Sequence, residues 1–304
     1  MLDADYRTDT NILVTHGAIG ANALVYQALV SQGDRVVTIV PSYQQHYAIP
    51  ESLGADVHRL HLNAERAYRP DLTELRRLVI PGTKLIAFSN PNNPTGSLMD
   101  RSTLEEIVKI ADSVGAYILS DELYRGTTQT EDVLTPALAD LYPLGISIGS
   151  MSKAFSLAGL RLGWVCGPRD VLREVEVHRD YNTISVGMLD DLFAAIALEN
   201  SDKILARSRH IVRTNLETLD RWLQTEPLLS YVKPQAGTVT LLRYPLDIPS
   251  HDFCLKLLEE TGVLFTPGSA FELEGCVRVG YANSAQILEE GLRRTSAFLC
   301  HYSS

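Results

Sequence analysis

Cysteine is scarce in this sequence, and its few cysteines are not arranged in pairs. Four cysteines occur among 304 residues, and none stands in a Cys-x-x-Cys spacing. Structural zinc sites and disulfide frameworks both depend on clustered thiols. We therefore expect a protein of a reducing, cytoplasmic compartment that holds no metal. The cysteines are Cys166, Cys254, Cys276 and Cys300.

The sequence also lacks a basic excess and long apolar runs. It has 27 lysines and arginines against 37 aspartates and glutamates, which gives a net charge of −10. Such an acidic chain is a poor partner for nucleic acids and anionic membranes. No apolar run reaches the roughly 20 residues of a membrane-spanning helix, and the polar start MLDADYRTDT is unlike a signal peptide. We expect a protein that binds neither nucleic acid nor membranes and that holds any phosphate in a local site.

The sequence does contain a regular alternation of short apolar segments and amphipathic helical patterns. Two helices are expected between the apolar segments: residues 20–34, with Gly33 as the C-terminal cap, and residues 100–115, closed by Gly115. The alternation predicts an α/β fold with a mostly parallel sheet sandwiched by helices. The predicted strands are residues 35–40, 84–90, 116–122, 145–150 and 161–167.

The pattern changes in the C-terminal part of the chain. Residues 201–225 have the periodicity of one long amphipathic helix that stops before Pro227. We expect a large domain, residues 1–200, and a smaller α+β C-terminal domain, residues 201–304, which begins with this linking helix. The other elements predicted there are strands at 237–244 and 275–282 and helices at 251–262 and from about Gln286.

Polar side chains follow several predicted strands at the point where each strand ends. In open α/β sheets, ligands bind outside the carboxyl ends of the strands, so these side chains are expected to share one site. Residues 15–21, THGAIGA, open a helix whose free amides favour an anion. Taken singly, each residue also has a structural explanation as a helix cap, a turn residue or a packing residue. The side chains are those of Tyr43, Asn93, Asp121, Ser150, Ser152 and Lys153.

Two arginines stand inside apolar segments. Arg161 lies between two leucines and Arg278 lies between two valines. A charge inside an apolar strand is costly unless it meets an opposite charge. Each arginine is therefore expected either to bind an anionic ligand or to form a structural salt bridge.

Lys153 stands three residues after Ser150 and next to Ser152, in the segment GSMSKAF. Two chemistries use such a group. One is the Ser-x-x-Lys nucleophile of penicillin-recognising enzymes, which is disfavoured because the chain has no Lys-Thr-Gly or Ser-Asp-Asn companion motif. The other is a lysine that forms a Schiff base with a phosphorylated cofactor, beside hydroxyls that hold the phosphate.

Three motifs together carry a family resemblance. The segments SNPNNPTG (89–96), SDELY (120–124) and SMSKAFSLAGLRLGW (150–164) occur in this order and spacing. They resemble the fold type I, aspartate-aminotransferase-like family of pyridoxal-phosphate enzymes, the class I/II aminotransferases. The resemblance implies a pyridoxal 5′-phosphate cofactor and a large cofactor-binding domain with a small C-terminal domain.

The resemblance also implies roles around the cofactor ring. Lys153 would form the Schiff base with the cofactor aldehyde and then move a proton between the substrate Cα and the cofactor C4′. Asp121 would pair with the pyridine nitrogen and keep it protonated, so that the ring accepts electrons from the carbanion. Tyr124 and Asn93 would donate hydrogen bonds to the 3-oxygen of the ring, and Tyr43 would stack on its face.

For the charged groups, the resemblance implies a phosphate cup and a carboxylate clamp. Arg278 would bind the substrate α-carboxylate through both guanidinium branches, close to Asn93 and Tyr43. The phosphate would be held by the amides of Gly17, Ala18 and Ile19 and by the side chains of Ser150, Ser152 and Arg161.

The function implied is an aminotransferase that exchanges an amino group between an amino acid and a 2-oxo acid. A β-eliminating lyase, an amino-acid cyclase and an inactive cofactor-binding homologue remain as alternatives. The family implies a homodimer. Because it normally has several dozen residues before the segment 15–21, we also expect the 304-residue form to be an incomplete or weakened enzyme.

The substrate side chain is not determined by the sequence, and no second arginine for a dicarboxylate can be assigned. The residues considered for the pocket or a subunit interface are Tyr43, Gln44, Gln45, His46, Arg125 and residues 181–187.

Overall fold

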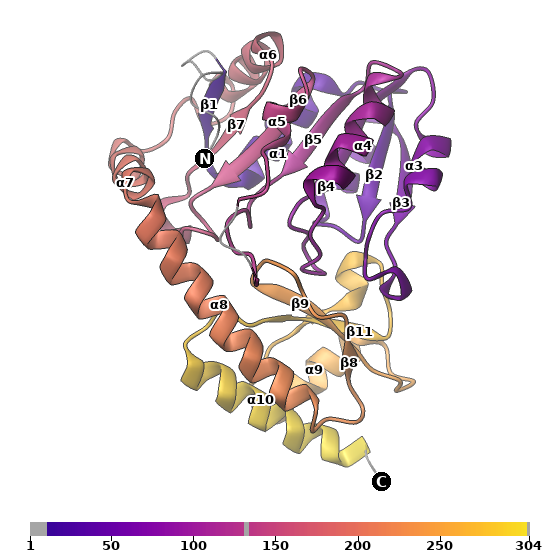
Figure 1. The fold of residues 1–304 in the computed structure, drawn as a ribbon, viewed down its shortest axis with the longest axis vertical. Coiled ribbons are helices and arrows are strands. Elements are labelled where there is room, and N and C mark those ends of the chain that lie inside the picture. The colour runs from indigo at the N-terminus through magenta and orange to yellow at the C-terminus, as the bar shows by residue number, and fades with distance from the viewer. Residues whose placement is uncertain (1–10, 131–133, 303–304) are drawn as a thin grey trace.

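The fold is built on two β-sheets, of which the larger has seven strands (Figure 1). The computed structural model describes residues 11–130 and 134–302. The large sheet has the order β1-β7-β6-β5-β4-β2-β3. Its central and edge strands β2 to β6 run parallel, and β7 runs antiparallel to both β6 and β1. The strands are β1 (Ile12–Thr15), β2 (Arg35–Val40), β3 (Asp56–His61), β4 (Thr83–Ser89), β5 (Tyr117–Asp121), β6 (Gly145–Ser150) and β7 (Gly163–Cys166).

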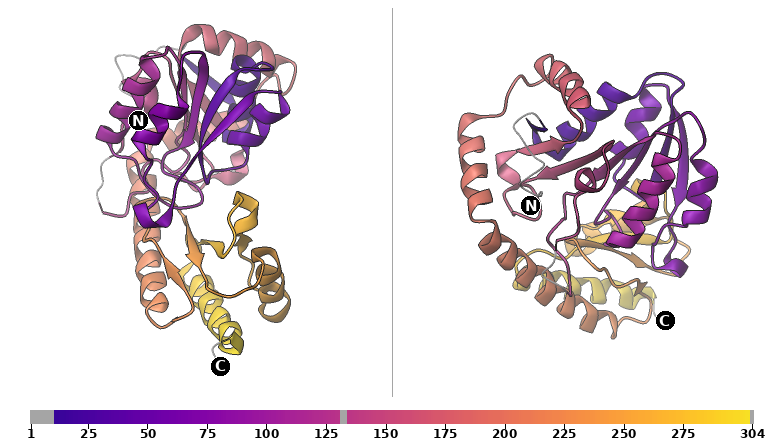
Figure 2. Two further views of the ribbon diagram at one scale, coloured as in Figure 1. Left: turned by 90° about the vertical axis from the view of Figure 1, so that its right-hand side faces the viewer. Right: turned by 45° about the horizontal axis from the view of Figure 1, so that its top comes forward.

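Helices cover both faces of this sheet (Figure 2, left). Because successive strand residues point to opposite faces, Leu85 packs under α1 and α6, whereas the next residue, Ile86, packs under α3 and α4. The two cores fix the strand ends relative to one another. The helices around this sheet are α1 (Gly17–Leu29), α2 (Gln45–Ser52), α3 (Leu72–Leu78), α4 (Arg101–Asp112), α5 (Leu138–Leu141) and α6 (Arg169–Asp180), with short 3-10 helices at Ala64–Arg66 and Ala158–Leu160.

The second sheet has four antiparallel strands in the order β10-β11-β9-β8. The long helix α8 runs from α7 beside the large sheet down to this smaller sheet, where it lies next to α10 (Figure 1). These elements are α7 (Met188–Glu199), α8 (Ser201–Leu223), β8 (Ser230–Tyr231), β9 (Val239–Arg243), α9 (Ser250–Thr261), β10 (Thr266–Pro267), β11 (Cys276–Gly280) and α10 (Ala285–Leu299), with 3-10 helices at Gly268–Phe271 and Cys300–Tyr302.

The predicted α/β fold is confirmed, as is its mostly parallel sheet. Four of the five predicted strands closely match β2, β4, β5 and β6, and the predicted helix at 201–225 matches α8. The patterns missed β3, which lies at the edge of the sheet and is only partly buried. An edge strand of this kind carries polar residues on both faces, so it lacks the apolar run that identifies its buried neighbours.

The predicted strand at 161–167 is wrong at its start. Strand β7 begins at Gly163. Arg161 precedes it in a turn, at the end of the 3-10 helix Ala158–Leu160, with a left-handed φ of 49°. Its charge therefore stands outside the apolar strand, and the reason given for its binding an anion fails. Arg278 does lie inside a strand, as the middle residue of β11, so the reason given for its binding an anion still holds.

Two predicted helix ends are also wrong. Helix α1 ends at Leu29 with Val30 as its cap, and α4 ends at Asp112 with Ser113 as its cap. Gly33 and Gly115 lie in the turns that follow, where each adopts a positive φ that favours glycine. The glycines thus mark how the chain turns into the next strand.

Among the described residues, no helix is both long and apolar enough to cross a membrane.

Candidate active site

The polar residues predicted from strand ends lie at one edge of the large sheet. Asp121 is the last residue of β5, and Ser150 is the last residue of β6. These two strands are parallel neighbours, so both side chains emerge at the same edge. Asn93 follows β4, and Lys153 follows β6 three residues after Ser150. The topology therefore brings into one site residues that belong to separate motifs.

Asp121 is held in place by donors from two other segments. Its Oδ2 accepts a hydrogen bond of 2.9 Å from Asn22 Nδ2 on α1, and His46 Nε2 lies 3.8 Å from the same oxygen. Its Oδ1 accepts a bond of 3.1 Å from the Leu123 amide. In the described part of the chain, Asp121 is followed by a turn at residues 123–126 and not by a helix, so the explanation of this residue as a helix cap is wrong.

Asn22 is a site residue that the sequence patterns missed. It is 1% exposed and lies on the buried face of α1, between apolar neighbours. A buried polar side chain needs a hydrogen-bond partner, and Asp121 is that partner. A polar residue on an otherwise apolar helix face is the sequence signal that could have identified Asn22 as a site residue.

A cluster of donors suited to an anion lies beside the start of α1. Ser150 Oγ lies 3.0 Å from Ser152 Oγ, and Arg161 Nη1 lies 3.5 Å from Ser152 Oγ. Helix α1 starts at Gly17, and no side chain caps its free amides. Gly17 has a φ of 68°, and a Cβ there would lie 3.2 Å from Arg161 Nη2. The positive φ favours glycine, and a side chain there would crowd the Arg161 guanidinium at the helix start, which is a position suited to an anion.

Arg278 reaches from the small sheet to the loop after β4. Its Nη1 donates a hydrogen bond of 3.0 Å to Asn93 Oδ1, and its Nη2 donates one of 3.0 Å to Thr266 Oγ1. The guanidinium carbon lies 5.2 Å from the centre of the Phe271 ring. All three partners are neutral, so they orient the guanidinium without cancelling its charge.

Lys153 lies in a cationic environment. Burial lowers the pKa of its amine, and the positive charges of Arg278 and then Arg161 lower it further. Among the described residues, none of these three cations forms an ion pair with a carboxylate. An acidic protein thus concentrates uncompensated positive charge at this one site, which attracts an anionic ligand.

Two tyrosines complete the site. Tyr124 is 3% exposed, and burial raises the pKa of its hydroxyl, against the lowering effects of the Arg278 charge and of a hydrogen bond with Thr238. Tyr43 is 37% exposed, which leaves its ring available to a ligand. Both tyrosines act electrostatically on Arg278, where they oppose the lowering of its pKa by burial.

Among the other residues considered for the pocket, His46 lies behind the site, and Gln44 and Gln45 form hydrogen bonds with the backbone beside it. His46 is fully buried behind Asp121. Gln44 donates to the carbonyl of Ala270, and Gln45 donates to the carbonyl of Ile19. Residues 181–187 lie partly beside the start of α1, where Asn182 and Thr183 line a small pocket with His16. His46 is therefore excluded as a residue that touches substrate in this structure.

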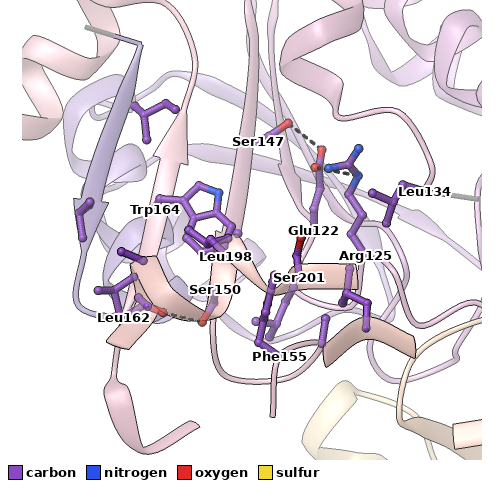
Figure 3. A pocket seen from close by; sticks show the side chains of 18 of the residues that line it. Glu122, Arg125, Leu134, Ser147, Ser150, Phe155, Leu162, Trp164, Leu198 and Ser201 are labelled. Atoms are coloured by element: carbon purple, nitrogen blue, oxygen red, sulfur yellow. Dashed lines mark hydrogen bonds and ion pairs between the residues drawn. The ribbon is translucent and has the colours of Figure 1, made fainter. Parts of the chain in front are cut away.

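Arg125 lines a separate cavity of about 500 Å³ between the large sheet and helices α7 and α8 (Figure 3). The cavity is mostly apolar, with Trp164 on one side. Its polar part is formed by Glu122, which accepts a hydrogen bond of 2.7 Å from Ser147 and lies 4.0 Å from Arg125. Burial raises the pKa of Glu122. Among the predicted site residues, Ser150 borders this cavity.

The sequence profile of the family "Aminotransferase class I and II" matches residues 3–294. The chain belongs to this family. Enzymes of the family depend on pyridoxal phosphate, and the chain is a pyridoxal-phosphate-dependent aminotransferase acting on amino acids and oxo acids. The predicted family, enzyme class and cofactor are confirmed.

The relatives include two aminotransferases and one enzyme named as a synthase. The chain is 30% identical over 286 residues to capreomycidine synthase of Streptomyces vinaceus, covering 94% of this chain and 73% of that protein. It is 27% identical over 296 residues to aspartate/prephenate aminotransferase of Thermus thermophilus, covering 96% and 76%. A crystal structure of a PLP-dependent aminotransferase from Streptococcus suis superimposes with a TM-score of 0.93 at 45% identity, covering 97% and 78%.

The lowered pKa of Lys153 predicts a pH profile for its chemical modification. Because the pKa lies below the ordinary value of 10.5, a larger fraction of this amine is unprotonated at mildly alkaline pH than in an exposed lysine. In the cofactor-free protein, an amine-acylating reagent should therefore modify Lys153 at lower pH than Lys109, as read by peptide mass mapping. The Arg278→Gln change removes a neighbouring positive charge and should shift the profile to higher pH. Identical profiles for Lys153 and Lys109 would contradict the prediction.

Proposed function

We propose that this site holds pyridoxal phosphate through one carboxylate, one amine and an aromatic side chain. Lys153 holds the cofactor covalently through its amine, and Asp121 pairs with the ring nitrogen. Tyr124 and Asn93 hydrogen-bond the ring oxygen, and Tyr43 covers the ring face. The fixed position of Asp121, with donors at both of its oxygens, supports its assignment, because an oriented carboxylate keeps a ring nitrogen protonated.

The phosphate is assigned to the donor cluster at the start of α1. The support is the convergence of two hydroxyls, one guanidinium and an uncapped helix start within one small volume. Each of these donors stabilises the negative charge of a phosphate dianion. The residues are the backbone of Gly17, Ala18 and Ile19 and the side chains of Ser150, Ser152 and Arg161.

Arg278 is assigned to the substrate carboxylate. Its two branches form a planar fork that matches a carboxylate, and the neutral partners Asn93 and Thr266 hold that fork in one plane. The charge of Arg278 lowers the pKa of Lys153, so a substrate carboxylate bound to Arg278 would lie within electrostatic reach of that amine.

The proposed reaction is the exchange of an amino group between an amino acid and a 2-oxo acid. When bound, the cofactor ring accepts electrons from the bond broken at the substrate Cα. Lys153 removes the proton from Cα, and its lowered pKa suits that role near neutral pH. Asp121 would stabilise the positive charge of the protonated ring nitrogen, and Tyr124 would stabilise the ring oxygen by a hydrogen bond. The observation that carries the proposal is that the Lys153 amine is partly buried near the charges of Arg278 and Arg161, at the sheet edge where Asn22 holds the Asp121 carboxylate.

Reduction with borohydride tests the covalent role of Lys153. Reduction fixes the bond between the amine and the cofactor aldehyde, so peptide mass mapping should find the pyridoxyl adduct on Lys153. An adduct on any other lysine would refute the assignment and with it the reaction proposed at this site.

A cyclase is the second candidate, because capreomycidine synthase is among the relatives at 30% identity. Incubation with one amino acid and no oxo acid separates the two functions. An aminotransferase stops after one half-reaction, whereas a cyclase or a lyase continues to turn over. A panel of amino donors read by cofactor absorbance should therefore show single-turnover changes, and it would also identify the substrate class.

We also expect two domains and a reducing compartment. The proposed large domain, residues 1–200, contains the seven-stranded sheet, and the proposed small domain, residues 201–304, contains the second sheet. Among the described residues, no two of the four cysteines form a disulfide, which supports a cytoplasmic location.

A homodimer is proposed through the outer face of α7. Five apolar side chains on this helix are 46–84% exposed, and such a patch marks an interaction surface. A second copy of the chain covers it in an isologous contact, next to residues 181–187, of which Asn182 and Thr183 line the pocket beside α1. The five residues are Met188, Leu189, Leu192, Phe193 and Ile196.

Analytical ultracentrifugation tests this interface. The wild-type chain should sediment as a dimer, and the double change Leu192→Asp with Phe193→Asp should give a monomer, because it places four charges in the contact. Ile287 is equally exposed on α10, so Ile287→Asp is the control and should remain dimeric. A monomeric wild type would rule out the proposal.

A further inference from the structure

Behind Asp121 lies a line of buried polar side chains that have no role in the reaction proposed above. Tyr26, His46 and Ser42 are 0% exposed, and Ser89 is 4% exposed. They come from α1, α2, the loop after β2 and the end of β4. Polar groups buried this deeply must satisfy one another, so their hydrogens have few possible positions.

The contacts form one chain that ends at Asp121. Tyr26 Oη lies 3.0 Å from His46 Nδ1, and His46 Nε2 lies 3.8 Å from Asp121 Oδ2. Ser89 Oγ lies 3.3 Å from His46 Nε2 and 3.3 Å from Ser42 Oγ. A neutral imidazole carries a proton on only one of its two nitrogens. The placement of that proton decides whether His46 attracts or repels the carboxylate.

Two proton arrangements are compatible with these contacts. In the first, Tyr26 donates to Nδ1, and the proton of His46 is on Nε2, facing Ser89 and Asp121. In the second, Nδ1–H donates to Tyr26, whose hydroxyl donates to the His46 carbonyl at 3.3 Å, and a bare Nε2 lone pair faces Asp121 Oδ2. An ionised carboxylate only accepts hydrogen bonds, so in the second arrangement Nε2 and Asp121 Oδ2, 3.8 Å apart, face each other with lone pairs, and Nε2 depends on a hydrogen bond from Ser89 Oγ at 3.3 Å.

The phenol is able to serve as the donor. Burial, and then the charge of Asp121, raise the pKa of Tyr26 well above its ordinary value, so its proton stays in place. The contact from Tyr26 Oη to Nδ1 is also shorter than its contact to the His46 carbonyl, 3.0 Å against 3.3 Å. The raised pKa keeps the phenol protonated in either arrangement, and the shorter contact favours the first.

We propose that Tyr26 is a positioning residue whose hydroxyl donates to His46 Nδ1, keeps the imidazole proton on Nε2 and so directs an N–H toward Asp121. Together with Asn22, this N–H stabilises the negative charge of Asp121 and fixes the direction of its Oδ2. The consequence for catalysis rests on the proposed pairing of Asp121 with the cofactor ring. The proton placement itself does not depend on that function.

Nitrogen-15 NMR of the imidazole ring in the cofactor-free chain tests the proton placement directly, because protonated and bare ring nitrogens differ in chemical shift. The wild type should have a protonated Nε2 and a bare Nδ1 on His46. Tyr26→Phe should give a mixture of the two tautomers. Tyr142→Phe is the matched control, because it removes another buried phenol hydroxyl, bonded to the Ala116 carbonyl, and it should leave His46 unchanged. A proton on Nδ1 in the wild type, in a neutral or a charged ring, overturns the proposal.

Turnover provides an independent test of how Tyr26 acts. Tyr26→Phe removes one neutral hydrogen bond, so we expect it to lower kcat by about 2- to 10-fold, less than removal of the Asp121 charge, with little change in KM. In a His46→Gln background the side-chain amide donates to Asp121 without help from Tyr26, so Tyr26→Phe should then have a much smaller effect. Equal effects in both backgrounds would show that Tyr26 does not act through His46, which overturns the proposal.

The two experiments separate this inference from the proposed function. An absent borohydride adduct on Lys153 would refute the reaction at this site and leave the NMR result intact. The expected adduct on Lys153, together with a proton on His46 Nδ1, would refute the proposed role of Tyr26 and leave the proposed reaction standing.

Discussion

Replacement of Lys153 by alanine should abolish turnover. The change removes the amine that holds the cofactor and takes the proton from the substrate. General acid–base catalysis alone contributes about 10²–10⁴-fold, so we expect kcat to fall by at least about 10⁴-fold once the covalent contribution is also lost. Lys153→Arg keeps a positive charge but cannot act as a base near neutral pH, and it should be equally inactive. The measurement is the half-reaction with a good amino donor, followed by cofactor absorbance.

Lys109 provides the control for this change. It lies on the exposed side of α4 and pairs with Glu106, so Lys109→Ala should keep wild-type turnover. If Lys153→Ala retained more than about a hundredth of the wild-type rate, the loss would fall below even the lower end of the general-base range, about 10²-fold. The proton would then have to pass through another group.

Replacement of Asp121 by asparagine should preserve cofactor binding and remove most of the activity. A neutral amide cannot keep the ring nitrogen protonated, whereas the amine of Lys153 and the donors at the start of α1 are unaffected. A charge-assisted hydrogen bond contributes about 1.5–3 kcal/mol, and each tenfold in rate corresponds to about 1.4 kcal/mol. We therefore expect kcat to fall about 10- to 100-fold, measured together with the cofactor content of the purified protein.

Asp100 serves as the control for Asp121. Its carboxylate caps α4 by accepting from the Thr103 amide, and asparagine is an equally good cap. Asp100→Asn should therefore be neutral. Wild-type turnover in Asp121→Asn would mean that its carboxylate charge has no role in the reaction.

The sequence by itself determined the local elements and the main chemistry. Apolar runs identified β2, β4, β5 and β6 because buried parallel strands are apolar on both faces. The motif around Lys153 identified the enzyme family, since the lysine, the hydroxyls and the arginine lie within twelve residues of one another along the chain. Contacts between residues that are close in sequence depend on local backbone geometry, and a sequence pattern predicts that geometry.

The contacts that orient the site were decided by tertiary structure. Asn22 and Asp121 are 99 residues apart in sequence, and Asn93 and Arg278 are 185 residues apart. The first pair meets because α1 packs across the large sheet, and the second because the small sheet lies against the loop after β4. Neither packing has a periodic signature in the sequence. The backbone turn at Arg161 likewise arises where the chain must enter β7, and a charged residue between two leucines does not reveal it.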